Sequence, residues 1–289
     1  MSAPARGLSA AAVADMARIK ADHPGGFTNR RRALRLVLIL AAVLLFTAFA
    51  MWRLDFSLTR IVTGLGRLAD FSMMMLPPSA GGRFWLYLHA LFETLAIAFL
   101  GTLVAALAAF PFAFLAAKNV IPNIFLHFGA RRLLDVIRGV DTLIWALLWV
   151  SVVGLGPFAG VLAIACSDFG ALGKLFSEAI ETADRKPVEG VASSGGSRWQ
   201  QVRFGVLPQI VPVIGGQCLY YFESNTRSAT IIGIVGAGGI GVHLAEQIRV
   251  LNLQDVSFLV LLILMAVTAI DIVSSRLRAA LIGVRTARD

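Results

Sequence analysis

The chain has 289 residues, of which 57% are hydrophobic and only 15% charged, with a formal net charge of +9 and a mean hydropathy of +0.78. Soluble domains are about 45–50% apolar, and a single soluble core of this size cannot bury so much apolar surface, so the composition excludes an ordinary soluble protein. The composition predicts an all-α, polytopic membrane protein in contact with lipid. No nucleic-acid partner is expected, because the arginines cluster at helix ends, where anionic headgroups and membrane topology account for them.

The N-terminal part combines a polar segment, 1–32, with a first apolar run that predicts a membrane helix over 33–52. A long polar stretch precedes this run and no small-residue cleavage site follows it, so we expect a retained anchor and not a signal peptide. Segment 57–75 has apolar residues at helical spacing, which predicts an amphipathic helix on the outer membrane surface. Residues 33–85 thus form the first span and an external amphipathic segment.

The remaining apolar runs predict five further helices, because a span needs about 20 mostly apolar residues. They cover 86–117, 132–154, 158–182, 207–235 and 255–280. Gly154, Gly156 and Pro157 predict a turn between the second and third of these helices. We expect a membrane-embedded core over 86–283 and a short tail over 284–289. Cys166 and Cys218 fall inside spans, where packing is expected and not a disulfide.

The basic residues predict the orientation of the chain. With a cytoplasmic N-terminus, segments 1–35, 118–138, 185–203 and 276–289 place 19 Lys/Arg in the cytoplasm, against five on the outer side. Only Lys174 and Arg227 then lie within spans. Because cytoplasmic loops carry the excess of Lys and Arg, both termini are expected in the cytoplasm.

The most informative polar segment is 184–208, with the sequence DRKPVEGVASSGGSRWQQVRFGVLP. Pro187 suits the first position of a short helix, and Gly195 and Gly196 can end it. Ser197, followed three residues later by Gln200, forms a capping box for a second helix. We expect a cytoplasmic helix-turn-helix elbow, with an ordinary connecting loop as the alternative.

This segment also resembles the cytoplasmic signature of ABC importer permeases, which reads E-A-A, three residues, G, nine residues, I, one residue, L-P. The spacing of the signature is kept at Glu189, Gly190, Val191, Gly195, Gly205, Leu207 and Pro208. Gly190 and Val191 stand in place of the two alanines, and Gly205 stands in place of the isoleucine. Longer stretches such as ETLAIAFLGTLVAALAAFPFAFLAAKN (93–119) and ATIIGIVGAGGIG (229–241) resemble phosphonate-class permeases. The resemblance covers most of the chain, from about residue 54 to residue 283.

The resemblance implies the type I importer fold, in a bacterial cytoplasmic (inner) membrane, with one extra N-terminal span. It implies four partners besides membrane lipid: a second permease copy, two cytoplasmic ABC ATPase subunits and an external substrate-binding protein. The imported substrate is expected to be phosphonate, with phosphate or phosphite as alternatives. Residues 189–196 would couple to the ATPase, with Arg198 and Trp199 as contacts. A passive channel or membrane scaffold is the alternative of a different class.

Charged and polar residues inside the predicted spans are candidates for the translocation path, because an unpaired charge costs about 2.5–3.5 kcal/mol there. Glu223 and Arg227 stand four apart, in the favourable order for an ion pair. Either this pair seals the bundle, or Arg227 lines an oxyanion path together with Asn225 and Ser228, since arginine supplies donors and positive charge. Asp168 would repel an anion, so we expect a structural role, with gating as the alternative.

Four glycines, Gly236, Gly238, Gly239 and Gly241, satisfy the dinucleotide-binding pattern G-x-G-x-x-G. A dinucleotide fold needs alternating strands and helices, whereas the surrounding chain predicts membrane helices. We therefore expect a re-entrant turn near an external gate, where irregular backbone is shielded by protein or faces water.

No residue pattern predicts an enzyme. The chain lacks a P-loop, because Leu175 follows Gly173-Lys174 and Asp168 stands in the place of the first glycine. ATP and Mg²⁺ are therefore expected on the partner subunit, with no cofactor on this chain. The four histidines lack metal-ligand spacing, so no metal site is expected either.

Overall fold

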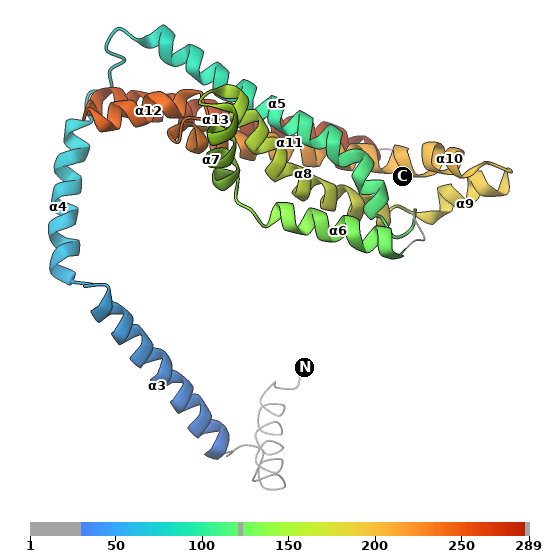
Figure 1. Cartoon of the computed structure of the whole chain (residues 1–289), viewed down its shortest axis with the longest axis horizontal. Helices are drawn as coiled ribbons and strands as arrows, with labels where there is room; N and C mark the ends of the chain where they lie inside the picture. Colours follow the sequence, from blue (N-terminus) through green and yellow to red (C-terminus); the bar gives the residue numbers. More distant parts are fainter. Residues whose placement is uncertain (1–29, 121–123, 287–289) are drawn as a thin grey trace, which may run out of the picture. The chain divides into compact units, whose positions relative to one another are not determined.

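The computed structural model describes residues 30–120 and 124–286, and all regular secondary structure within them is helical (Figure 1). Five helices are long and apolar enough to cross a membrane, and the number rises to six if one bent pair forms a single span. The prediction of an all-α membrane protein with about six spans is therefore confirmed. The chain divides into two compact units, Met1–Asp70 and Phe71–Asp289.

The first unit contains α3 (Arg30–Arg53) and most of α4 (Leu58–Met74). Leu34–Arg53 has none of its apolar window buried within the protein, so this helix needs lipid as its surroundings. In α4 the apolar side chains of Ile61, Val62 and Leu65 are exposed. The helices expected over 33–52 and 57–75 are confirmed, and the place of the second on the outer membrane surface stays a prediction.

The second unit is a helical bundle that carries the candidate site. Its elements are α5 (Phe84–Ala116), α6 (Ile124–Arg138), α7 (Thr142–Val153), α8 (Pro157–Glu181), α9 (Arg185–Ser193), α10 (Arg198–Gln200), the π-helical turn η1 (Gln201–Val206), α11 (Leu207–Ile234), α12 (Ile240–Arg249) and α13 (Leu253–Thr286). Within this unit α9 and α10 lie at one end and α12 lies at the other (Figure 1).

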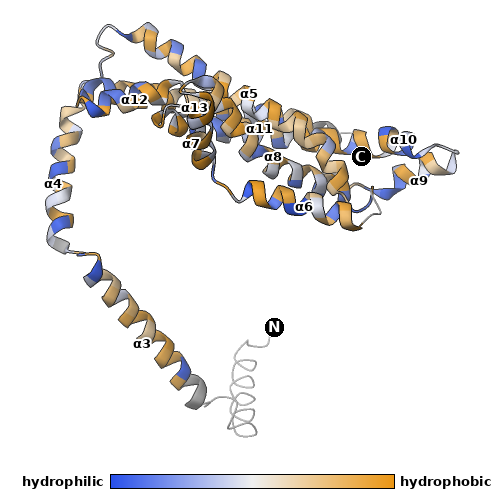
Figure 2. Cartoon of the chain, in the orientation of Figure 1, coloured by the Kyte–Doolittle hydropathy of each residue, from blue (hydrophilic) through white to orange (hydrophobic). Residues whose placement is uncertain are grey.

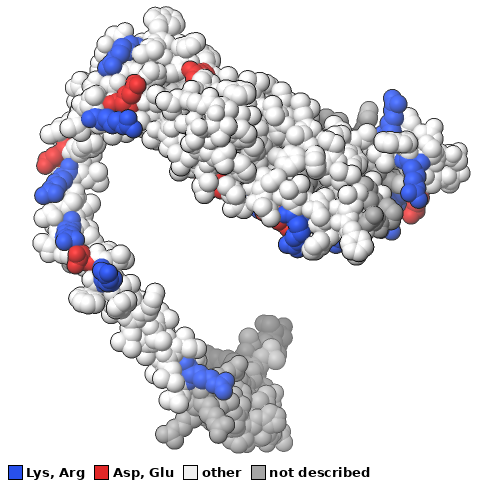
Figure 3. Space-filling model, viewed as in Figure 1, with Lys and Arg blue, Asp and Glu red and all other residues white. Residues whose placement is uncertain are grey.

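The polar residues of this unit lie mainly near the same two ends. Figure 2 shows long apolar stretches along α5, α8 and α13, and hydrophilic residues on α9 and α10. On the face of this unit that Figure 3 shows, charged side chains gather around α6, α9 and α10 at one end and around α12 at the other. This distribution suits a bundle whose middle faces hydrocarbon and whose ends face water.

Small residues allow α5 and α8 to pack closely. Gly101, Ala105, Ala109 and Ala113 repeat every four residues on one face of α5, and all are buried. A Cβ atom at Gly101 would lie 2.7 Å from the Cβ of Ile164 on α8, so no larger residue fits without a shift. Such small-residue stripes let membrane helices gain packing where the hydrophobic effect gives no drive between them.

The prediction of a single helix over 132–154 is wrong. The structure has two helices here, α6 and α7, and the chain bends by 83° between them. The break has a local cause, because the carboxylate of Asp141 accepts a hydrogen bond from the N–H of Leu143 at 2.8 Å and so begins α7 as its N-cap. The next turn is confirmed, since Gly154 and Gly156 have φ of +93° and +135°, and Pro157 opens α8.

The sequence also missed α12, which follows the glycine-rich turn. The other core helices begin and end within a few residues of the predicted bounds, apart from α13, which extends to Thr286. α12 packs into a buried cluster with the start of α5 and with α13, formed by Tyr87, Ala90, Leu91, Ile240 and Leu259. It therefore caps the bundle at the end opposite to α9 and α10.

Candidate functional site

The segment 184–208 forms the expected helix-turn-helix elbow, made of α9, α10 and η1. The carboxylate of Asp184 accepts from the N–H of Lys186 at 3.0 Å and caps α9, which begins two residues before Pro187. Gly195 has a φ of +81°, a conformation that favours glycine. The capping box is present, because the N–H of Ser197 donates to Oε1 of Gln200 at 2.7 Å while the Ser197 hydroxyl accepts in return. The two short helices predicted from sequence are therefore confirmed.

A side-chain clamp that the sequence did not indicate joins the two ends of the elbow. Gln209, in the first turn of α11, accepts from the N–H of Asp184 at 2.9 Å and donates to its carbonyl at 3.0 Å. Gly205 lies against α9, where an added Cβ would sit 2.9 Å from the Cα of Val188. The glycine that replaces the isoleucine of the family signature thus allows η1 and α9 to touch through their backbones.

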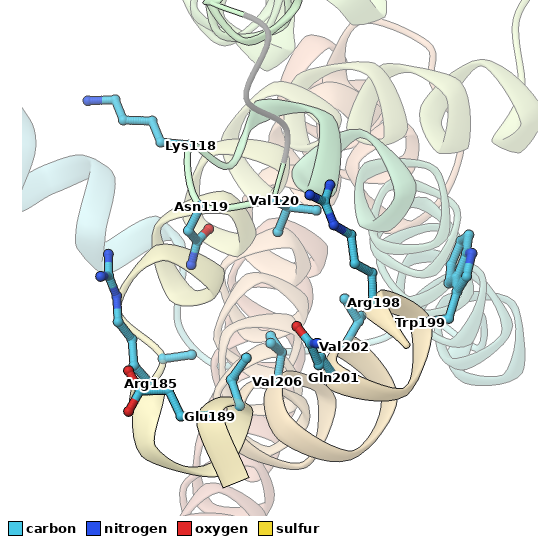
Figure 4. A pocket seen from close by; sticks show the side chains of 12 residues that line it. Lys118, Asn119, Val120, Arg185, Glu189, Arg198, Trp199, Gln201, Val202 and Val206 are labelled. Carbon is cyan, nitrogen blue, oxygen red and sulfur yellow. The ribbon is translucent and has the colours of Figure 1, made fainter. Parts of the chain in front are cut away.

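The predicted coupling residues surround two grooves of the elbow. The larger, of about 710 Å³, is lined by Glu189, Arg198 and Trp199 among others, and by the loop after α5 (Figure 4). The smaller, of about 440 Å³, is lined by Gly190, Val191, Gly195 and Gly196. Leu207 and Pro208 begin α11.

Two large apolar side chains of the elbow are exposed beside these grooves. Trp199 is 84% exposed and Phe204 is 59% exposed. In Figure 4 the Trp199 side chain stands at the edge of the residues that line the larger groove. Exposed aromatic residues at a polar end of a protein are typical of a contact with another protein.

A charge cluster lies next to the larger groove, whose lining includes Lys118. Glu181, at the end of α8, accepts from Nη2 of Arg131 and from the backbone N–H of Lys118, each at 2.8 Å. These contacts join the middle of α6 to the C-terminal ends of α5 and α8. Nearby, Lys174 of α8 pairs with Asp135 of α6 at 2.8 Å, so this cation within a predicted span has a partner.

A second polar site, apart from the elbow, lies between α11 and α13. It consists of Glu223, Arg227 and Arg278 and so contains the predicted pair Glu223 and Arg227. Glu223 is buried, and Arg227 approaches it at 3.8 Å. Arg278 of α13, which the sequence did not single out, donates to the same carboxylate at 2.9 Å. One buried carboxylate therefore faces two guanidinium groups.

A third set of polar residues joins α5, α8 and α11 inside the bundle. The side-chain amide of Asn225 donates to the carboxylate of Asp168 and, at 2.8 Å, to the hydroxyl of Thr102. All three residues are buried. Asp168 thus bonds to another helix, and its neighbour Ser167 bonds to Thr142. Ser228, from the predicted path, is half-buried and bonds back to its own helix.

The glycine motif forms a sharp turn between α11 and α12. Gly236, Gly238 and Gly239 have φ of +96°, +87° and +74°, whereas Gly241 already lies in α12. A Cβ on Gly241 would overlap the carbonyl oxygen of Thr230, so close backbone approach requires this glycine. The turn expected from sequence is present, and its role as an external gate stays a prediction.

Helix α5 supplies the hydrogen-bond acceptors for this turn. Glu93 accepts from the N–H of Gly239 at 3.0 Å, and Thr94 accepts from the N–H of Ile240 at 2.8 Å. These are N–H groups at the start of α12, which have no partner within the helix. Sequence reasoning missed both residues, because they stand 146 positions away from the groups that they cap.

An ionic clasp closes the same end of the bundle. Asp255, near the start of α13, is 3% exposed and accepts from Arg83 at 2.7 Å and from the hydroxyl of Tyr87. Gln247 of α12 lies within 3.3 Å of Arg83. These contacts hold α5, α12 and α13 together.

Comparison with known proteins gives a consistent result. A family model described as binding-protein-dependent transport system inner membrane component matches residues 109–282. The phosphite transport system permease protein PtxC of Stutzerimonas stutzeri is 37% identical over 248 residues, which cover 86% of this chain and 89% of that protein. The phosphate-import permease protein PhnE of Mycolicibacterium smegmatis is 41% identical over 190 residues, which cover 66% of this chain and 36% of that protein.

Among solved structures, an inward-facing MetNI methionine ABC transporter matches with a TM-score of 0.61 and 18% identity. The match covers 70% of this chain and 99% of that chain. The fold is therefore that of a type I importer permease, as the sequence predicted.

Proposed function

The chain belongs to the family of binding-protein-dependent transport system inner membrane components and is a permease subunit of an ABC importer, and from this premise we propose that its substrate is a tetrahedral phosphorus oxyanion: phosphite, phosphate or an alkylphosphonate. The proposal rests on the relatives named for phosphite and phosphate and on the chemistry of the second polar site. The observation that carries it is the pair of arginines, Arg227 and Arg278, around one buried carboxylate.

Arg227 is the residue that we assign to the translocation path. Its side chain is 52% exposed. It stands seven residues before the end of α11, or roughly 10 Å along the helix axis. A guanidinium group can bind a carboxylate or phosphate oxygen through two parallel N–H donors. Asn225 and Ser228 neighbour it, while Asp168, held by Asn225, serves to fix the helices.

We assign the exposed face of α11 to a contact with a second copy of the chain. Val213, Tyr220, Arg227 and Ile234 repeat every seven residues, so they lie on one face, and all are exposed. A charge in this face would cost about 2.5–3.5 kcal/mol if it met lipid. Two such faces, one from each copy, would enclose a path in which Arg227 meets water and substrate.

The elbow is assigned to the contact with the motor. In this proposal one cytoplasmic ATPase subunit binds each elbow, with Trp199 and Phe204 as apolar contacts, and holds ATP and Mg²⁺. Both chain termini then lie on the same cytoplasmic side as the elbow. An external substrate-binding protein delivers the oxyanion to the glycine turn at the other end, which we assign to the external gate.

The test is uptake in lipid vesicles that contain this permease, its ATPase and its binding protein. We expect ATP-dependent uptake of at least one of phosphite, phosphate and methylphosphonate, and none of methionine. The Trp199→Ala variant should reduce ATPase binding, whereas Trp85→Ala, an exposed residue at the start of α5, should not. Uptake without ATP would favour a passive channel, and absence of uptake for all three oxyanions would refute the proposed substrate.

A further inference from the structure

The two arginines at the second polar site are not equivalent. Arg278 forms a charge-assisted hydrogen bond of 2.9 Å with Oε2 of Glu223, and its side chain is 24% exposed. Arg227 lies 3.8 Å from Oε1, beyond hydrogen-bond distance, and its side chain is 52% exposed. The carboxylate is therefore bound by the less exposed guanidinium and only approached by the more exposed one.

We propose that Arg278 is a positioning residue for oxyanion transfer: by binding Glu223 it leaves the positive charge of Arg227 available to the passing anion. The inference rests on the proposed function and identifies which side chain sets the charge of its path. The role is indirect, because Arg278 acts through Glu223.

The charge balance explains why a second arginine is needed. Glu223 and Arg227 stand four apart on α11 in the favourable order for an ion pair. Without Arg278 the buried carboxylate would have Arg227 as its nearby cation and would compete with the oxyanion for the same N–H donors. With Arg278 present the site holds two positive charges and one negative charge, so one positive charge remains for the substrate.

A sealing role for the same three residues makes a different prediction. If the cluster only holds α11 against α13, the variants should change the amount of assembled complex and leave uptake per assembled complex unchanged, because an unpaired buried carboxylate destabilises the protein whether or not it lies near the path. If Arg278 acts by neutralising Glu223, removing the carboxylate as well should free Arg227 again. The double variant therefore distinguishes the two roles.

The experiment measures uptake and ATP hydrolysis by the reconstituted complex, with its binding protein saturated by whichever of phosphite, phosphate and methylphosphonate the wild-type complex imports fastest. We expect Arg278→Gln to lower uptake about tenfold or more, while hydrolysis stimulated by the binding protein remains. Arg278→Lys should keep most of the uptake, since it keeps the charge. Arg276→Gln, an exposed position on the same helix, is the matched control and should behave as wild type.

The decisive variant is Glu223→Gln/Arg278→Gln, which should regain uptake to within about threefold of Glu223→Gln alone. Uptake is compared per assembled complex, so that recovery reports the state of Arg227 and not the yield of protein. If Arg278→Gln does not assemble and the double variant does, the cluster acts structurally and the inference is overturned. The inference is overturned if Arg278→Gln imports at the wild-type rate, or if the double variant assembles and stays as inactive as the single one. Failure of the proposed function would appear separately, as absence of oxyanion uptake by the wild-type complex.

Discussion

Replacing Gly205 by alanine should loosen the elbow without unfolding the bundle. The added Cβ would lie 2.9 Å from the Cα of Val188 and 3.2 Å from its backbone nitrogen. Backbone atoms cannot rotate away, so η1 and α9 must separate. Overpacking of this kind costs about 1–3 kcal/mol, which corresponds to a factor of roughly 5 to 150 in the local opening equilibrium. The isoleucine of the family signature at this position should be worse than alanine.

Hydrogen exchange measures this effect directly, because amides of α9 exchange when the elbow opens. We expect amide exchange in α9 to become faster by a factor of roughly 5 to 150 and exchange in α8 to stay unchanged. Gly129→Ala is the control, since a Cβ there meets nothing within 4 Å. Wild-type exchange rates in α9 of the Gly205→Ala protein would refute the reasoning that backbone contact between η1 and α9 holds the elbow closed. Coupled ATP hydrolysis should fall together with the protection of α9.

Two further predictions concern the opposite end of the bundle. Thr94→Val removes the acceptor of the Ile240 N–H and should destabilise the start of α12 by about 1–3 kcal/mol, measured as faster exchange of that amide; unchanged exchange would contradict the capping role. Arg83→Ala, which leaves the buried Asp255 carboxylate without its cation, should lower the melting temperature in nanodiscs more than Tyr87→Phe, which removes one hydrogen bond. Equal losses would show that the ion pair adds nothing to the clasp.

The features that the sequence predicted correctly depend on residues close together in the chain. Spans were visible as runs without charge, and the elbow was visible as a capping box between Ser197 and Gln200 with glycine before it. The bend after α6 had a local signal as well, because Asp141 is a favourable N-cap residue, but the apolar run after it outweighed that signal and suggested one helix. Local patterns thus predicted the long apolar helices and the elbow, and erred at the junction between α6 and α7.

The features that the sequence missed depend on contacts between distant residues. α12 is a ten-residue helix of mixed apolar and polar residues, too short to appear as a span, and it is capped by Glu93 and Thr94 of α5. The Arg278 contact joins positions 55 residues apart, whereas the sequence displayed only the nearer Glu223–Arg227 spacing. No periodicity or motif reports such pairs, since they arise only when the helices pack.

Helix α11 links the regions assigned to the motor, the path and the gate. Residues Arg198–Ile234 form one nearly continuous helical run, which starts in the elbow, carries Arg227 and ends at the glycine turn. The π-helical turn η1 interrupts its regular hydrogen bonding beside the elbow, and such interruptions are common at functional sites. Because the clamp from Gln209 joins the elbow to the first regular turn of α11, a displacement of α9 must move α11 or break that clamp. The start of α12, in contrast, is tied to α5 by Glu93 and Thr94. Movement of the elbow would therefore change the position of Arg227 relative to α5, and in the proposed function this movement couples ATP hydrolysis by the partner to opening of the path.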